Sequence, residues 1–230
     1  MVPTTVKEKL SGDDFTRTQM EIPLFLPEDI LEYLVGTLGL EIEQQAVEKY
    51  WLHARTFDCP WKNVSLDSSH WLLGLYGDAA KYSPAGQKNL AYFLNIVLWA
   101  PKSSRMSRWL LFSMEMDHCL GPESLNPLFN RIVKSLRSCY NGLTIKGQTY
   151  RFAVSELRGD WEWHVYAFDL QRNWRMHTFC WRCDVSRKPG APCSMLDLED
   201  EPDWAETQLS SIQFLSRMIS PSTASSLSSN

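Results

Sequence analysis

Two aspartates each follow a glycine at the end of a short apolar segment. Asp78 ends the segment HWLLGLYGD, which begins at His70, and Asp160 ends RFAVSELRGD, which begins at Arg151. Taken singly, each Gly-Asp pair is more typical of an ordinary turn. Taken together, they resemble strand-end carboxylates, a common position for functional groups in α/β folds. Such a pair offers the hard oxygen ligands that Mg²⁺ or Mn²⁺ needs for two-metal phosphoryl transfer.

A third acid usually completes such a set, and the sequence offers candidates only near its C-terminus. The segment LDLEDEPDWAE, from Leu196 to Glu206, is strongly acidic and leads into a predicted last helix. Glu206 is the best candidate, followed by Glu199 and Glu201. The alternative is that these carboxylates form a solvated acidic face, which is what most acidic clusters are.

A cluster of sulfur and nitrogen ligands follows the second aspartate. His177, Cys180, Cys183 and Cys193 have the spacing H-x2-C-x2-C-x9-C. A C-x-x-C pair places two thiolates on one tight turn, which suits tetrahedral Zn²⁺, and the other two residues can complete the ligand set. The alternative, equally compatible with one C-x-x-C pair, is a set of ordinary structural thiols.

Basic and aromatic residues alternate around the same cluster, a pattern that suits a nucleic-acid backbone and unstacked bases. A solvated loop face is the competing interpretation. The candidate nucleic-acid-binding residues are Arg172, Arg175, Trp181, Arg182, Arg187 and Lys188.

The composition is that of a folded protein with a sizeable core. The chain has 230 residues, 44% of them hydrophobic, and a net charge of −4, which argues against a uniformly basic nucleic-acid binder. No apolar run is long enough for a membrane span, and the first residues lack the apolar core of a signal peptide. We therefore expect a nuclear or cytoplasmic protein with no membrane partner, in which six cysteines are thiols or metal ligands.

The chain is expected to divide into four parts. Residues 1–20 are expected to form a disordered leader and residues 21–57 a helical segment. Residues 58–219 are expected to form an α/β domain with a small Cys/His insertion at 177–193, followed by a disordered serine-rich tail at 220–230. Within the helical segment, helices are expected from Pro27 and from Leu40 to His53.

The apolar periodicity places the two aspartates on a mixed sheet flanked by helices. Strands are predicted at Trp71–Tyr76, Leu90–Trp99, Trp109–Met114 and around Arg151–Leu157, with a helix over Leu125–Leu136 before the last strand. Three antiparallel strands, a helix, and a fourth strand parallel to the first are the connectivity of the ribonuclease H-like fold. This connectivity brings the ends of the first and fourth strands together.

Several blocks of the sequence resemble a known group of proteins. LYGDAAKYSPAG, the WLLF segment at Trp109, RFAVSELRGDWEWH and FCWRC resemble uncharacterised proteins of dinoflagellate algae and, more distantly, the catalytic core of CACTA-type and Plavaka-type DDE transposases. The resemblance implies a ribonuclease H-like nuclease fold, DNA as substrate and Mg²⁺ as cofactor. Asp78 and Asp160 would be the first and second acids, and Cys180 and Cys183 would belong to a Cys/His insertion.

The sequence departs from the transposase pattern in three respects. No glutamate occupies an unmistakable third position, the charge balance is acidic, and no terminal DNA-binding domain is visible. Two functions therefore stay open: metal-dependent cleavage or transfer of DNA strands, or a catalytically inactive relic that binds nucleic acid or protein through a zinc-stabilised turn.

Overall fold

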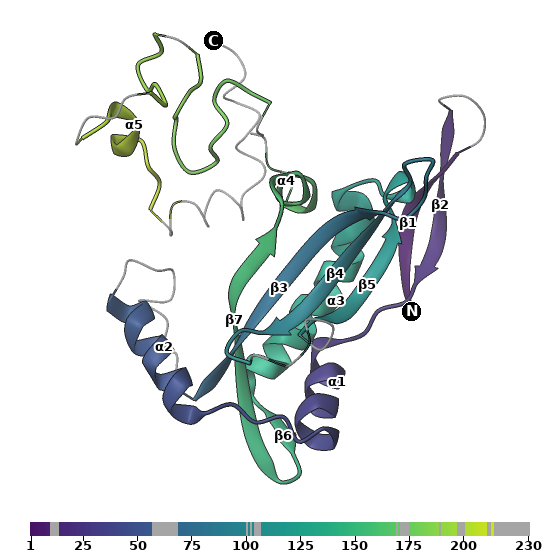
Figure 1. The fold of residues 1–230 in the computed structure, drawn as a ribbon. Coiled ribbons are helices and arrows are strands. Elements are labelled where there is room, and N and C mark those ends of the chain that lie inside the picture. The colour runs from purple at the N-terminus through teal and green to yellow at the C-terminus, as the bar shows by residue number, and fades with distance from the viewer. Residues whose placement is uncertain are drawn as a thin grey trace.

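The chain folds as a mixed α/β protein built on one curled five-stranded sheet (Figure 1). The structure is a computed structural model. It describes residues 1–9, 14–56, 69–99, 101, 103, 107–168, 170, 175–188, 190–196, 201–210 and 213.

The sheet has the strand order β5-β4-β3-β7-β6. Its strands are β3 (His70–Lys81), β4 (Lys88–Ile96), β5 (Trp109–Glu115), β6 (Leu143–Ile145) and β7 (Gln148–Gly159). β3, β4 and β5 are successive antiparallel neighbours, whereas β7 runs parallel to β3 and β6 antiparallel to β7. The predicted strands and the parallel return of the fourth are confirmed. The unpredicted addition to this sheet is the short strand β6.

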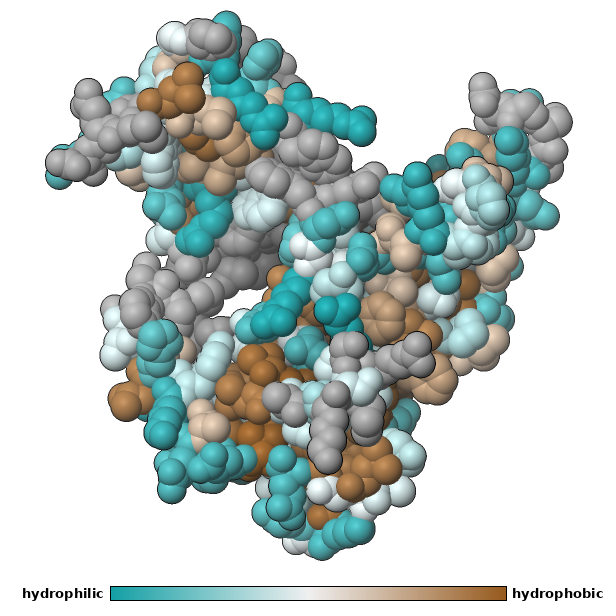
Figure 2. Space-filling view, viewed as in Figure 1, coloured by the Kyte–Doolittle hydropathy of each residue, from teal (hydrophilic) through white to brown (hydrophobic). Residues whose placement is uncertain are grey.

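Alternation along β4 shows which face of the sheet carries the core. Leu90, Tyr92, Leu94 and Ile96 are all buried, while the residues between them are half-buried. Tyr92 contacts Phe129 of the long helix, with 5.2 Å between ring centres. The buried face of β4 is therefore the face that the long helix covers, as a period of two predicts. In Figure 2, apolar side chains gather over the lower middle of the molecule, where β3 and β7 lie in Figure 1.

The long helix α3 (Pro122–Asn141) connects β5 to β6 and β7 across that face. It follows Gly121, whose φ of 64° suits glycine, and Gly142, with a φ of 122°, ends it. Its buried side chains recur at helical spacing: Leu125, Leu128, Ile132, Ser135 and Cys139. The predicted helix over Leu125–Leu136 is confirmed and extends about one turn further at each end.

The N-terminal residues form an antiparallel hairpin, so the predicted disordered leader is wrong. The hairpin consists of β1 (Val2–Lys9) and β2 (Phe15–Ile22). Val2, Thr4 and Val6 alternate inward and are buried. The sequence concealed this pattern because one of the three inward residues is a threonine, which leaves only two apolar residues to mark the buried face.

A buried serine fastens this hairpin to α3. Ser124 Oγ donates a hydrogen bond of 2.6 Å to the carbonyl oxygen of Thr5 and accepts one of 2.8 Å from the N–H of Leu120. Arg17 forms an exposed ion pair of 3.2 Å with Glu123. The hairpin therefore belongs to the folded body, and the ion pair adds little because both side chains are exposed.

The remaining N-terminal segment is helical, as expected. It contains α1 (Pro27–Glu32), a π-helical turn (Tyr33–Thr37) and α2 (Gln44–Thr56), which begins four residues after the predicted start at Leu40. Trp51 of α2 is buried and donates a hydrogen bond of 2.8 Å from Nε1 to the carbonyl oxygen of His70 at the start of β3. This contact joins α2 to the sheet.

After the sheet, α4 (Trp161–Phe168) follows β7 directly, and the four-residue α5 (Asp203–Glu206) lies apart from the sheet (Figure 1). A 3₁₀ turn (Met116–His118) precedes α3. The predicted tail at 220–230 and most of the predicted last helix lie outside the described residues. Among the helices that the structure describes, none is both long and apolar enough to cross a membrane.

Candidate metal and nucleic-acid site

A pair of glycines in register on two parallel strands immediately precedes the two aspartates. Gly77 of β3 is in register with Gly159 of β7, and neighbouring strands lie about 4.8 Å apart. Asp78 directly follows Gly77, and Asp160 directly follows Gly159. The strand ends therefore come together as predicted. One detail differs: β3 continues through Asp78 to Lys81, because β4 pairs with it as far as Lys81↔Lys88.

Trp163 of α4 explains why both of these positions are glycine. A Cβ atom on Gly77 would lie 1.8 Å from Trp163 Cε2, and one on Gly159 would lie 2.5 Å from Trp163 Cε3. The buried indole also stacks on Tyr92, with 5.5 Å between ring centres and 17° between planes. The indole thus packs directly on the backbone of both strands, and this packing fixes α4 against the strand ends that carry the aspartates.

Asp78 lies on the sheet face opposite to Trp163, because side chains alternate along β3. Its Oδ2 accepts a hydrogen bond of 2.7 Å from the Tyr76 hydroxyl, and its Oδ1 accepts one of 2.8 Å from the N–H of Ala79. The hydrogen bond to Asp78 raises the pKa of Tyr76, and burial raises it further. The Arg108 guanidinium lies 4.2 Å from the centre of the Tyr76 ring. Asp78 is therefore held in one orientation by a tyrosine whose ring also contacts Arg108.

Asp160 caps the helix that follows it. Its Oδ1 accepts a hydrogen bond of 2.6 Å from the backbone N–H of Trp163, the third residue of α4. Within the part of the chain that the structure describes, no hydrogen bond to Oδ2 is found. A carboxylate with one oxygen used by a cap and the other oxygen open can still bind a cation.

His164 of α4 is a site residue that the sequence analysis missed. Burial lowers the pKa of His164, while the charge of Asp160 and a hydrogen bond with the Gly159 backbone act in the opposite direction. Its ring also lies 5.8 Å from that of Trp181. The available signal was its place four residues after Asp160, which puts it one helical turn from the cap.

The predicted third acid does not join the two aspartates. Glu206 is exposed on α5. The residues that follow α5 are instead hydrogen-bonded to the cysteine segment, the part of the chain from His177 to Cys193. The N–H of Leu209 donates to the carbonyl oxygen of Arg182 at 2.7 Å. Glu199 lies outside the described residues, and Glu201 is exposed. Among the residues whose positions are described, no three His, Cys, Asp or Glu side chains are grouped to hold a metal.

We expect Asp160→Ala to lower the free energy of unfolding by about 1 kcal/mol, because α4 loses its cap. Asp160→Asn is the matched control, since an asparagine amide oxygen caps a helix about as well. Urea denaturation should therefore find Asp160→Asn close to the wild type. Equal losses in both variants would show that the charge of Asp160, and not its capping bond, stabilises the fold.

The cysteine segment brings together two of its four predicted ligands. Cys183 is buried beside Cys180: burial raises the pKa of Cys183, a hydrogen bond with the Val185 backbone lowers it, and the neighbouring Cys180 raises it again. Cys180 Sγ accepts a bond of 3.3 Å from the N–H of Arg182. His177 and Cys193 lie on the same folded segment, whose backbone is held by bridges Thr178↔Ser186 and Ser186↔Ser194. A four-ligand zinc site is not assembled among the described residues.

The predicted basic residues have different roles in the structure. Arg182 donates from Nη2 to the carbonyl oxygen of Leu209 at 3.2 Å, so it holds the chain together. Arg187 lies over the Phe179 ring at 4.5 Å. Arg175 and Lys188 are exposed, Trp181 is half-buried, and Arg172 lies outside the described residues. The exposed Lys188 side chain can contact a phosphate backbone, whereas Arg182 is bonded within the chain.

Comparison with known proteins adds no relative: no protein-family model matches the chain, and no curated protein matches it.

Proposed function

We propose that this chain is a ribonuclease H-like domain that acts on nucleic acid. The support is topological. Three successive antiparallel strands, β3 to β5, lead through α3 to β7, which returns parallel to β3. The departure from the simplest version of the fold is β6, which pairs antiparallel with the outer side of β7.

We propose further that Asp78 and Asp160 bind one Mg²⁺ or Mn²⁺. The observation that carries this proposal is the Gly77↔Gly159 register, because it brings the backbone positions of Asp78 and Asp160, each one residue further on, to the same end of two neighbouring parallel strands. Mg²⁺ is commonly held by one or two carboxylates together with water and substrate phosphates, so two aspartates are a sufficient protein contribution. A bound cation would supply a Lewis acid that activates water and stabilises the leaving oxygen.

The protein residues would contribute orientation and charge. The Tyr76 hydroxyl and the Ala79 N–H fix the Asp78 carboxylate, and α4 fixes Asp160. Arg108, which lies over Tyr76, adds a positive charge suited to a phosphodiester. Together with the resemblance to DDE transposases, these features favour DNA cleavage or strand transfer over chemistry on small molecules.

The direct test is nicking of supercoiled plasmid in Mn²⁺ or Mg²⁺. We expect open-circular DNA to form with the wild type, to disappear with EDTA, and to fall at least about a hundredfold with Asp78→Asn, which keeps the side-chain shape but removes a metal ligand. Asp117→Asn is the matched control, because Asp117 lies in the 3₁₀ turn before α3. Nicking that persists equally in Asp78→Asn would contradict the proposal.

A second candidate function is a nucleic-acid or protein binding module without catalysis. It is favoured by one observation: both Asp78 oxygens already accept hydrogen bonds, and no third metal-binding side chain joins the two aspartates among the described residues. Under this proposal DNA binding is independent of Mg²⁺ and unchanged in Asp78→Asn, and no nicking occurs. Elemental analysis of the purified protein tests the accompanying zinc prediction, which requires about one Zn²⁺ per chain.

A further inference from the structure

The sheet face opposite to α3 carries two adjoining aromatic rings. Tyr92 contacts α3, and side chains alternate along a strand, so the next residue, Phe93, lies on the other face of the sheet. Phe93 is in register with Tyr76 of β3, and the centres of the two rings are 6.2 Å apart. Both side chains are half-buried. The two rings are therefore partly accessible on the face that α3 does not cover.

Arg108 and Leu110 extend this aromatic surface. The Arg108 guanidinium lies 4.2 Å from the centre of the Tyr76 ring, and the residue is exposed. It therefore covers Tyr76 with a second flat group, and nucleobases stack on guanidinium planes as well as on aromatic rings. Leu110 of β5 is in register with Phe93 and is 37% exposed. The surface thus spans three neighbouring strands at one level of the sheet.

The positive charge of this surface comes from the connection between β4 and β5. Three basic residues and no acidic one lie between Trp99 and Trp109: Lys102, Arg105 and Arg108. Arg108 is the one among them that the structure describes. Arg158 of β7 lies on the same face of the sheet but is paired with Glu156 at 2.5 Å, so it adds no net charge. A partner with accessible rings and negative charges would be complementary to this combination.

We propose that single-stranded nucleic acid binds to this face, with one base stacked on Phe93 and the Arg108 guanidinium and with phosphates near the basic β4–β5 connection. Asp78 lies two residues beyond Tyr76 on the same face, roughly 7 Å further along β3. The bound strand therefore passes next to the proposed metal site. This inference deepens the function proposed above, on which it rests, by naming an unpaired strand as the substrate.

A single strand is favoured over a duplex because a ring on the protein can stack on a base only when that base is not already stacked in a helix. Stacking tolerates any sequence, since every base has a π face. The same chemistry is present in DNA and RNA, so the two are distinguished by experiment.

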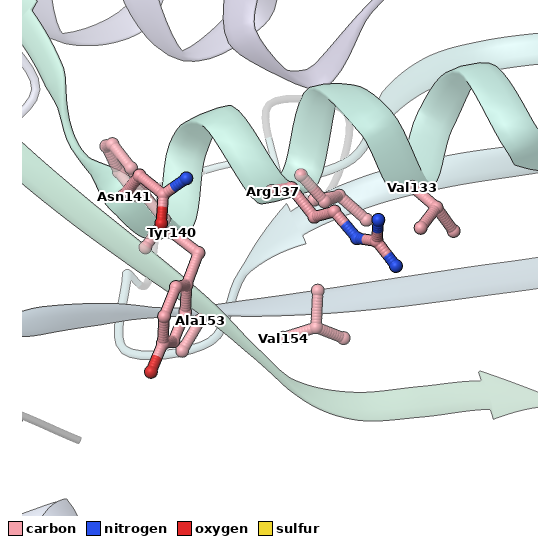
Figure 3. Close-up of a pocket in the computed structure, with 8 residues that line it drawn as sticks. Val133, Arg137, Tyr140, Asn141, Ala153 and Val154 are labelled. Atoms are coloured by element: carbon pink, nitrogen blue, oxygen red, sulfur yellow. The ribbon is translucent and has the colours of Figure 1, made fainter. Parts of the chain in front are cut away.

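The groove on the α3 side of the sheet differs from this surface. It lies between α3 and β7, has a volume of about 360 Å³, and Arg137 is the one basic residue among the described residues that line it. Figure 3 shows Val133 and Tyr140 projecting from α3 toward β7. Tyr140 is 37% exposed, and its ring centre lies 4.9 Å from that of His70. Tyr140 is therefore an accessible aromatic residue outside the proposed surface, which makes it a matched control.

The test is equilibrium binding of fluorescein-labelled oligomers to the full chain in EDTA, measured by fluorescence anisotropy. The oligomers are single-stranded oligothymidine and oligouridine of about 12 nucleotides and a DNA duplex of the same length. We expect the better of the two single strands to bind at least about tenfold more tightly than the duplex. Phe93→Leu should weaken that binding about tenfold, because one base loses its stacking partner. Tyr140→Leu should bind like the wild type.

The charge of Arg108 is tested by the salt dependence of the same binding. Loss of one phosphate contact to a single strand makes the slope of log K against log salt concentration less steep by about 0.7. We expect this change in Arg108→Gln. Lys49→Gln, at an exposed position on α2, is the matched control and should keep the slope of the wild type.

Equal affinity for duplex and single strands would overturn the inference, and so would equal losses in Phe93→Leu and Tyr140→Leu. Circular dichroism separates loss of binding from loss of folding. Photo-cross-linking of a 5-iodouracil oligomer to the wild type locates the contact without any substitution. Cross-links are expected in β3, β4 or the β4–β5 connection, and cross-links confined to other peptides would contradict the inference.

The result is distinguishable from that of the plasmid assay, because binding is measured without a metal ion. Preferential binding of a single strand without plasmid nicking would support this inference and contradict the proposed metal chemistry. Nicking by a protein that shows no preference for single strands would do the reverse.

Discussion

Replacing Gly77 with alanine is expected to destabilise the fold at or above the upper end of the roughly 1–3 kcal/mol that overpacking costs. The added Cβ would lie 1.8 Å from Trp163 Cε2, closer than any real contact. The indole is buried and stacked on Tyr92, so it has no free space into which to move. Guanidinium denaturation followed by circular dichroism measures the loss, and tryptophan fluorescence reports the displacement of the indole.

Gly74→Ala is the matched control for this prediction. Gly74 lies on the same strand, and the atoms nearest to its added Cβ would be those of the Asn95 side-chain amide, the closest at 2.4 Å. That amide is the end of a flexible side chain that can turn away, so the cost should be well below that of Gly77→Ala. Trp163→Leu in the Gly77→Ala background should recover part of the loss. Equal effects of the two alanines would refute the proposed packing of Trp163 on Gly77.

Replacing Trp51 with alanine is expected to cost about 3–5 kcal/mol, which is usual for removal of a buried tryptophan. Trp51 is 1% exposed and carries the hydrogen bond from α2 to the His70 carbonyl oxygen. Trp51→Phe keeps most of the apolar volume and loses the N–H, so about 1–3 kcal/mol is expected from the unpaired carbonyl. Leu52→Ala, at the adjacent exposed position, should cost less than about 0.5 kcal/mol.

Hydrogen exchange distinguishes how the Trp51 variants fail. If Trp51 attaches α2 to an otherwise intact sheet, amide protection in α2 falls in Trp51→Ala while protection in β3 and β4 persists. If α2 belongs to one cooperative unit with the sheet, protection falls everywhere together. Unchanged stability in Trp51→Ala would contradict the contact itself.

The strands and their order could be predicted because each strand is an apolar run with a clear break at its end. The buried alternation of β4 and the glycines around α3 are local signals, and the parallel return of β7 follows from the intervening helix. For the same reason the sequence predicts that Asp78 and Asp160 meet. The residues that surround the two aspartates could not be predicted from the sequence. The contact of Tyr76 with Arg108, for example, depends on the directions of side chains on different strands.

The N-terminal hairpin and the third acid show where pattern reading fails. β1 buries Thr4 between two valines, and its stability depends on Ser124, which lies 119 residues further along the chain. No local pattern contains such a contact. Glu206 was chosen for its place in an acidic segment, whereas the structure uses the adjacent residues to bond the cysteine segment. The acidic character of this segment was therefore not enough to predict whether Glu206 would lie near Asp78 and Asp160.

The packing of one indole on two glycines has a consequence for the evolutionary record of this protein. A side chain at Gly77 requires a smaller residue at 163, and a side chain at Gly159 would in addition meet the Gly77 carbonyl oxygen at 2.8 Å, so the two glycines are constrained for as long as Trp163 is kept. A distant relative with low sequence identity should therefore keep a Gly-Asp on the first strand of the sheet and a Gly-Asp-x-x-Trp at the end of the fourth strand. That spaced signature offers a way to find distant members of the lineage and to ask in which of them the two acids persist.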